Sequence, residues 1–250
     1  MKVGIQLQPQ ATTMARMRSA AKAADEMGVD SIWTWDHFYP LFGDPDASHF
    51  EGWMTLAAFG ADTSRAKIGM LVTGNTYRNP ELLADMARTL DHITGGRAYL
   101  GVGAGWFERD YTEYGYEFGT ARSRLMELES ALERMTARIS SLNPQPVGDL
   151  PILIGGGGEK ITLRLVATYA NAWNTFGPPE NFAAKSAVLD RWCAEVGRDS
   201  AEIERTVALS ADDDHPVEAY LEAGATHFIV MKSDPFDFTK VEELLAFRDA

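Results

Sequence analysis

The stretch Trp35-Asp36-His37-Phe38 places a carboxylate and an imidazole side by side at the end of an apolar run. Histidine can pass a proton at neutral pH, because its unperturbed pKa is about 6.5, and it can donate a hydrogen bond to an electron-rich ring. We expect His37, steadied by Asp36, to be catalytic. The alternative is that the pair only pins the following loop, Tyr39–Asp46, and the residue types favour neither interpretation.

Four consecutive glycines, Gly155, Gly156, Gly157 and Gly158, follow the apolar residues Pro151–Ile154 and precede a helical pattern. Such a loop leaves backbone N–H groups free at the positive end of a helix dipole, which is a geometry that binds phosphate. Lys160 and Arg164 would add positive charge. The competing interpretation is a flexible turn, but the position between a strand and a helix favours phosphate.

Glycines also end two other apolar runs, with Gly103 and Gly105 after Ala98–Val102, and Gly74 after Lys67–Thr73. Glycine weakens a strand by roughly 0.5–1 kcal/mol relative to alanine, so a cluster of glycines requires a reason. We expect a large, flat ligand to lie against Gly103 and Gly105. A tightly packed barrel layer is the alternative.

Aromatic and amide side chains accompany these strand ends. The aromatic residues could wall a substrate pocket or equally belong to the core. Asn174 is expected to meet a ligand or to cap its loop. Glu108 and Asp110 are weaker acid/base candidates, and residues in such positions are more often solvated loop charges. Gln6, Gln8 and Gln10 are amides, which are poor metal ligands, and the five histidines are scattered, so no metal site is expected. The expected pocket aromatics are Trp35, Phe38, Trp53, Trp106 and Phe107.

The elements that must position these residues alternate between short apolar runs and helical patterns along the whole chain. Eight strands and eight helices in 250 residues predict an α/β fold, a (β/α)8 TIM barrel formed by one domain over residues 1–250. In such a barrel the chemistry lies at the carboxyl ends of the strands. The predicted strands are Lys2–Gln8, Ser31–Asp36, Lys67–Thr73, Ala98–Gly103, Pro151–Gly155, Ala172–Phe176, Arg205–Ser210 and His227–Lys232. The predicted helices are Ala15–Met27, Gly52–Thr63, Pro80–Ile93, Arg122–Ser140, Lys160–Tyr169, Asn181–Val196, Val217–Ala223 and Thr239–Arg248.

Composition restricts the partners. The chain carries 23 Lys and Arg against 36 Asp and Glu, a net charge of -13, which disfavours a nucleic acid partner. The single cysteine, Cys193, excludes an intramolecular disulfide. No apolar run approaches the roughly 20 residues needed to cross a bilayer, so no membrane span is expected. Since the amino-terminal sequence lacks a signal-peptide pattern, we expect a cytoplasmic protein.

Over roughly residues 1 to 180, four motifs in order resemble those of the luciferase-like monooxygenase superfamily, and in particular its coenzyme F420-dependent oxidoreductase subgroup. The motifs are Asp36-His37-Phe38, Val72–Pro80, Gly95–Trp106 and the glycine loop Gly155–Gly158. The resemblance implies a bacterial luciferase-like TIM barrel.

The resemblance implies hydride transfer between F420 and a small organic substrate, catalysed with His37. The ring of the cofactor would lie against Leu71, Val72, Thr73, Gly74 and Asn75, often on a non-prolyl cis peptide, here at Leu71-Val72 or one residue later. Its phosphate would bind the glycine loop, and a homodimer is possible. The alternatives are an FMN-dependent monooxygenase, or a flavin- or deazaflavin-binding protein without catalysis. Trp106 stands where the sugar-phosphate dehydrogenases of the group carry an acidic glutamate, so that chemistry is disfavoured.

Overall fold

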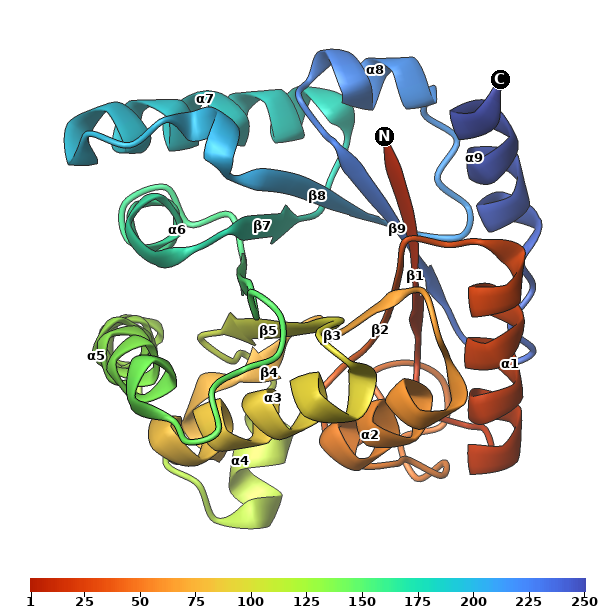
Figure 1. Ribbon diagram of the computed structural model, residues 1–250, viewed down its shortest axis with the longest axis horizontal. Coiled ribbons are helices and arrows are strands. Elements are labelled where there is room, and N and C mark those ends of the chain that lie inside the picture. The colour runs from red at the N-terminus through yellow and green to blue at the C-terminus, as the bar shows by residue number, and fades with distance from the viewer.

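Parallel β-strands form a closed barrel with helices around it in the computed structural model, which describes residues 1–250 (Figure 1). Strands adjacent along the chain pair in parallel, except that β3 and β4 both pair with β5; the pairings β1–β9 and β3–β5 close the barrel. The predicted eight-stranded barrel is confirmed, with β3 and β4 as two pieces of its third strand. The strands are β1 Lys2–Leu7, β2 Ser31–Thr34, β3 Lys67–Met70, β4 Thr73–Gly74, β5 Ala98–Gly103, β6 Ile152–Gly155, β7 Ala172–Thr175, β8 Glu204–Leu209 and β9 His227–Lys232.

Helices follow the strands and cover the outside of the barrel (Figure 1). Local sequence sets several of their ends: Asn79 caps α3 by accepting from Leu82 N, and Gly28, Gly95 and Gly197 take left-handed conformations after α1, α3 and α7. The helices are α1 Met14–Met27, α2 Gly52–Asp62, α3 Pro80–Thr94, α4 Glu108–Tyr114, α5 Ala121–Ser141, α6 Thr162–Tyr169, α7 Pro179–Val196, α8 Val217–Glu222 and α9 Thr239–Asp249, with short 3-10 helices η1 Asn75–Tyr77 and η2 Ser200–Glu202.

Two local features differ from the simple alternation that the sequence predicts. The predicted strand Lys67–Thr73 is interrupted between β3 and β4, where the Leu71–Val72 peptide bond is cis, at the first of the two positions that the resemblance implied. Helix α4 was not predicted, because Glu108 and Asp110 were interpreted as charges of the loop that follows the predicted strand Ala98–Gly103.

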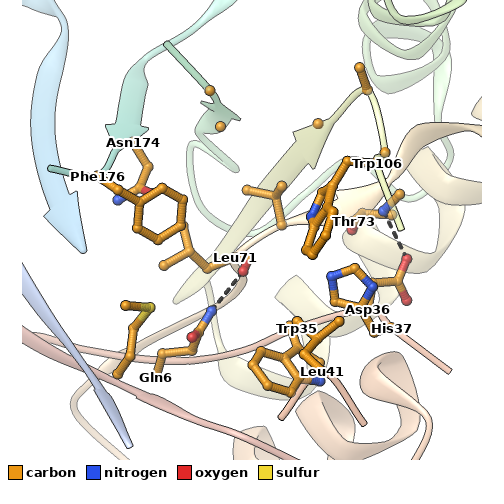
Figure 2. A pocket seen from close by; sticks show the side chains of 18 of the residues that line it. Gln6, Trp35, Asp36, His37, Leu41, Leu71, Thr73, Trp106, Asn174 and Phe176 are labelled. Atoms are coloured by element: carbon orange, nitrogen blue, oxygen red, sulfur yellow. Dashed lines mark hydrogen bonds between the residues drawn. The ribbon is translucent and has the colours of Figure 1, made fainter. Parts of the chain in front are cut away.

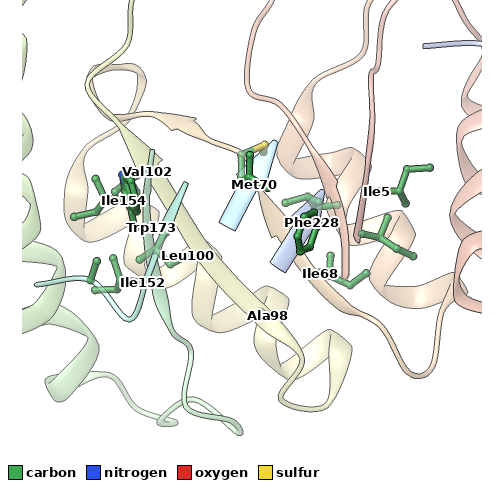
Figure 3. Packing of buried hydrophobic residues seen from close by; sticks show 14 of the residues in the cluster. Ile5, Ile68, Met70, Ala98, Leu100, Val102, Ile152, Ile154, Trp173 and Phe228 are labelled. Atoms are coloured by element: carbon green, nitrogen blue, oxygen red, sulfur yellow. The ribbon is translucent and has the colours of Figure 1, made fainter. Parts of the chain in front are cut away.

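The hydrophobic core has two parts. Fifty buried residues, some drawn in Figure 3, pack mainly between the strands and the surrounding helices. Seven more form a separate cluster, and all belong to the strands or to the link between β3 and β4: Trp33, Leu71, Tyr99, Leu153, Ala172, Ala208 and Ile229. Trp33, the third residue of β2, packs on Tyr99, the second residue of β5, with ring centroids 5.2 Å apart. This second cluster fills the barrel interior, and an open cavity remains at the carboxyl ends of the strands.

Candidate active site

A cavity of about 580 Å³ lies at the carboxyl ends of the strands, which is a normal size for a small-molecule site. Most of the predicted site residues line it and come from β2, β5, β6, β7 and the broken third strand (Figure 2). The predicted residues in its lining are Trp35, Asp36, His37, Leu71, Val72, Thr73, Gly74, Gly103, Gly105, Trp106, Gly155, Gly156, Gly157, Gly158 and Asn174.

Three predicted site residues do not line this cavity. Phe38 turns away from it and stacks on Tyr114, with ring centroids 4.1 Å apart. Trp53 lies in the first turn of α2 and packs into the hydrophobic core. Asn75 is buried in η1 and borders a separate surface hollow. Phe107, the other aromatic candidate, contacts the His37 ring edge-on from outside the lining.

The partner of His37 is Asp110 in α4, and not Asp36 as the sequence suggested. His37 Nδ1 lies 2.7 Å from Asp110 Oδ2, which also accepts from Tyr77 Oη at 2.9 Å, while Asp110 Oδ1 accepts from Phe38 N. The Asp110 side chain is completely buried, so its interpretation as a solvated loop charge was wrong. Burial, with Asp110 adding to the effect, raises the pKa of Tyr77, and its phenol therefore remains a donor.

This arrangement leaves one nitrogen of His37 for chemistry. Because the Asp110 carboxylate accepts at Nδ1, the neutral imidazole carries its proton there. Nε2 has no hydrogen-bond partner in the protein, and the His37 side chain is 15% exposed at the cavity. His37 can therefore accept a proton at Nε2, or donate one after protonation, to a ligand in the cavity.

Asp36 has a structural task next to this pair. Its carboxylate forms a two-pronged ion pair with Arg78, at 2.6 and 2.9 Å, and accepts from Gly74 N at 3.1 Å (Figure 2). Burial raises the pKa of Asp36 to about 6, against the opposing effect of Arg78. Asp36 thus ties the second strand to the residues that follow the cis peptide.

The floor of the cavity is built around Val72, at the cis peptide. A methyl group added to Gly103 would lie 2.7 Å from Val72 Cγ2, and one on Gly155 would lie 3.0 Å from Val72 Cγ1. Gly105, at φ +79°, leaves room for the Tyr111 hydroxyl. These glycines therefore accommodate protein side chains, and a flat ligand would rest on Val72, not directly on Gly103 and Gly105 as the sequence suggested.

Unpartnered polar atoms surround this floor. Gln6 Nε2 donates to Leu71 O at 2.7 Å, but Gln6 Oε1 is buried without a partner, as is the Thr73 hydroxyl (Figure 2). Both residues line the cavity. Buried polar atoms usually find partners, so these two are candidates to bond a ligand.

The glycine loop is fixed at its start and open afterwards. Gly156, at φ +125°, donates to Asn174 O at 2.9 Å, and its carbonyl accepts from Trp173 Nε1 at 2.8 Å. The N–H groups of Gly157 and Gly158 donate to no protein acceptor, and α6 begins a few residues later. Thus the backbone presents free donors to the cavity next to the start of a helix.

The charges around this loop differ from the expectation. Neither Lys160 nor Arg164 lines the cavity, and Arg164 pairs with Glu129 at 2.8 Å. Lys185 in α7 lies closer, since its Cε is 3.7 Å from a methyl group built on Gly157, and its ammonium pairs with Glu159 at 2.7 Å.

The side-chain amides of Asn174 and Gln10 form hydrogen bonds within the protein. Asn174 Nδ2 donates to Thr206 Oγ1 at 2.7 Å, within the barrel. Gln10 binds the loop that follows β2: its Oε1 accepts from Leu41 N at 2.8 Å, and its Nε2 donates to Phe42 O at 3.0 Å.

Several lining residues were missed from the sequence. Leu41 and Phe42 belong to the long loop after β2, where no hydrophobic period indicates their direction. Phe176 immediately follows β7 and is the last residue of the predicted strand Ala172–Phe176, so its position at a strand end was a usable signal. The others are Gln6 and Gln8, whose amides can hydrogen-bond a ligand but were not named as site residues, and Tyr77, Ala104, Thr162 and Met231.

The structure is a closed parallel TIM barrel with a histidine and a glycine-rich loop with free backbone N–H groups at the carboxyl ends of its strands. The sequence model of the luciferase-like monooxygenase family matches residues 1–243. The chain therefore belongs to the luciferase-like monooxygenase family. No helix in the structure combines the length and apolar character of a membrane span.

Relatives in this family have more than one activity. The chain is 27% identical over 220 residues to a 4-hydroxyprotoasukamycin monooxygenase from Streptomyces nodosus subsp. asukaensis, covering 76% of this chain and 56% of that protein. It is 27% identical over 240 residues to an F420-dependent glucose-6-phosphate dehydrogenase from Kineococcus radiotolerans, covering 88% of this chain and 70% of that protein. The chain thus spans little more than half the length of the first relative.

Among solved structures, an F420-dependent secondary alcohol dehydrogenase in complex with an F420-acetone adduct has a similar fold. The TM-score is 0.84, the sequence identity is 18%, and the match covers 95% of each chain. At this identity the likeness concerns the fold.

Proposed function

We propose that this protein is an F420-dependent oxidoreductase that transfers a hydride between the deazaflavin and a small organic substrate. The observation that carries the proposal is the joint position of two features in one cavity. The free N–H groups of Gly157 and Gly158 lie at one end, and His37, with an unused Nε2, belongs to the same lining.

The residues present fit such a cofactor. Gly157 and Gly158 would hold its phosphate, where their free N–H groups supply attraction that an acidic chain otherwise lacks. Gln6 Oε1 and the Thr73 hydroxyl, both buried and unpartnered, would meet the polar edge of its ring, and Val72 would support the face of the ring. The similar F420-dependent dehydrogenase and the similar fold favour F420.

The chain's own residues would orient the reacting groups, exclude water from them and transfer a proton. Bound F420 would supply the two-electron redox chemistry. Asp110 fixes the ring of His37 so that Nε2 faces the cavity, and His37 would there bind or move the proton of the reacting substrate oxygen. Trp35, Leu41 and Trp106 would exclude water around that nitrogen.

The second candidate is an FMN-dependent monooxygenase, which the similarity to a monooxygenase of the same family favours. The glycine loop would hold the phosphate of either cofactor. A binding protein without catalysis would retain the loop but would not depend on His37.

Titration of the apo-protein with F420 and with FMN, followed by flavin and deazaflavin fluorescence, tests the proposal. We expect tighter binding of F420, and a clear preference for FMN would replace the proposal with the monooxygenase. Gly156→Asp places a carboxylate beside the anion loop and should weaken binding of the preferred cofactor by about 10-fold or more.

Gly197→Asp is a control for the added carboxylate, because Gly197 also has a positive φ, at +72°, but lies after α7, outside the cavity. Equal cofactor affinity in the Gly156 and Gly197 variants would contradict phosphate binding by the loop.

A further inference from the structure

The cavity contains almost no charge available to a substrate. Its lining includes no lysine and no arginine, and its only side chains that can be charged at neutral pH are Asp36 and His37. The Asp36 carboxylate is neutralised by Arg78, whose guanidinium also pairs with Glu51 at 2.8 Å. Thus, apart from the glycine loop and a protonated His37, no side chain of the lining compensates the negative charge of an anionic substrate.

The mouth of the cavity is instead aromatic. Phe42, Trp106 and Phe176 line the cavity, yet they are 61%, 64% and 55% exposed. They come from three different segments, and Figure 2 shows Trp106 and Phe176 facing the cavity from two sides. Large aromatic side chains left open to water around a cavity are typical of binding surfaces for apolar ligands.

These side chains surround the proton-handling group. The Trp106 ring meets the His37 ring edge-on, with centroids 5.6 Å apart, and Trp35 does so at 5.8 Å. Phe42 packs beside Trp35 at 6.2 Å. A ligand that reaches His37 Nε2 from the mouth must therefore pass its body between aromatic surfaces.

We propose that the substrate is an uncharged, ring-bearing or otherwise apolar molecule with one hydrogen-bonding oxygen. Its apolar body would lie between Phe42, Trp106 and Phe176, and its oxygen would meet His37. This inference rests on the proposed function and specifies the substrate class of the same site. Sugar phosphates and carboxylates are disfavoured, because the mouth offers them no counter-charge.

A pair of probes that differ only in charge tests the inference. Acetophenone and 4-acetylbenzoate share an aromatic ketone, but the second carries a carboxylate. Each is titrated into the protein saturated with oxidised F420, which occupies the anion loop, and affinity is measured by calorimetry and by tryptophan fluorescence. We expect acetophenone to bind about 10-fold or more tightly than 4-acetylbenzoate, because the carboxylate would lose water without gaining a partner.

Two variants locate the effect at the mouth. Trp106→Ala should weaken acetophenone binding by about 5-fold to 10-fold, as expected for the loss of one aromatic contact, and leave F420 affinity unchanged. Phe247→Ala, which truncates an exposed aromatic of α9 outside the cavity, should change neither affinity. Phe176→Lys adds a cation at the mouth and should reverse the preference toward 4-acetylbenzoate.

The outcomes separate this inference from the proposed function. If F420 does not bind, both proposals are overturned. If F420 binds while 4-acetylbenzoate matches or exceeds acetophenone in the unmodified protein, only the substrate class is wrong. Retention of full acetophenone affinity in Trp106→Ala would likewise overturn the aromatic mouth as the binding surface.

Discussion

Two buried or half-buried histidine–carboxylate pairs lie at opposite ends of the barrel, and they differ in how much of the imidazole is used. At the carboxyl end, His37 is bonded through Nδ1 to Asp110, and its Nε2 has no protein partner. At the amino end, His227 uses both nitrogens: Nδ1 lies 3.1 Å from Glu204 and Nε2 lies 2.7 Å from Ser31 Oγ. The same residue types therefore produce a reactive group at one end and a closed network at the other.

The surroundings reinforce this difference. The His227 side chain is 1% exposed, and Glu204 also accepts from the Tyr99 hydroxyl at 2.8 Å and pairs with Lys2. In this network at the amino end of the barrel, the polar groups are hydrogen-bonded and the charges are balanced, as buried polar groups must be to contribute to stability. A histidine and a carboxylate in contact indicate chemistry only when one ring nitrogen remains free toward a cavity.

Replacement of each histidine by alanine gives the largest expected contrast. His37→Ala should lower kcat by about 10²-fold to 10⁴-fold, the usual contribution of general acid–base catalysis, with F420 affinity largely preserved. His227→Ala should leave kcat nearly unchanged but destabilise the protein by about 2–4 kcal/mol, because buried partners lose their bonds. Steady-state kinetics with a neutral ketone, F420 titration and thermal unfolding measure the three effects. Equal kcat in the two variants would remove the distinction between the ends.

Asp110→Asn tests the orientation of His37 with a smaller expected effect. An amide can donate to Nδ1 and so favour the wrong tautomer, in which the proton lies on Nε2. We expect kcat to fall by about 10²-fold, the lower part of the range for acid–base catalysis, with little change in KM. The pH profile of kcat should shift as well, which a purely structural role of Asp110 would not produce. An unchanged pH profile would argue that Asp110 only supports the fold.

Glu204→Gln is expected to have the smallest effect, and it depends on pH. Hydrogen bonding and charge pairing with His227, joined by Lys2, overcome the opposing effect of burial and lower the pKa of Glu204 to about 2. A lowered carboxyl pKa stabilises the fold above the ordinary pKa of glutamate, and this stability is lost as the pH falls toward 2. We expect the variant to be about 2 kcal/mol less stable at pH 7, and the difference to shrink in acid. Denaturant unfolding from pH 7 down to the acid limit of the native state checks this, and a constant difference would contradict the pairing.

The predictable part of the fold depends on local signals. Asn79 and Pro80 mark the start of α3, and Gly95 marks its end; each signal consists of one or two residues at the boundary itself. The residues of a strand such as Ala98–Gly103 are likewise consecutive in the sequence. Every predicted strand and helix therefore has a counterpart in the structure. The α-helix that was not predicted is α4, with seven residues.

The site was less predictable because its partners are distant in sequence. The bond between His37 and Asp110 spans 73 positions, and the neighbouring Asp36 is the nearer but incorrect candidate. Gly103 was correctly placed in the cavity lining, yet the side chain that occupies the space beside it is Val72, in the link between β3 and β4. Trp53 could not be told from a pocket residue, because an aromatic at a helix start packs equally well in a core.

The loop after β2 offers a means of redesign. Its carboxyl-terminal end is held by backbone bonds of Ser48 to Ala11 and of Phe50 to Pro9, and the Gln10 amide secures its middle. Leu41 and Phe42 therefore reach the cavity from a segment that forms no part of the barrel wall. Longer or differently shaped segments grafted between those anchors would alter which molecules gain entry while the supporting scaffold stays intact. Related enzymes can acquire different substrates through exchange of this loop.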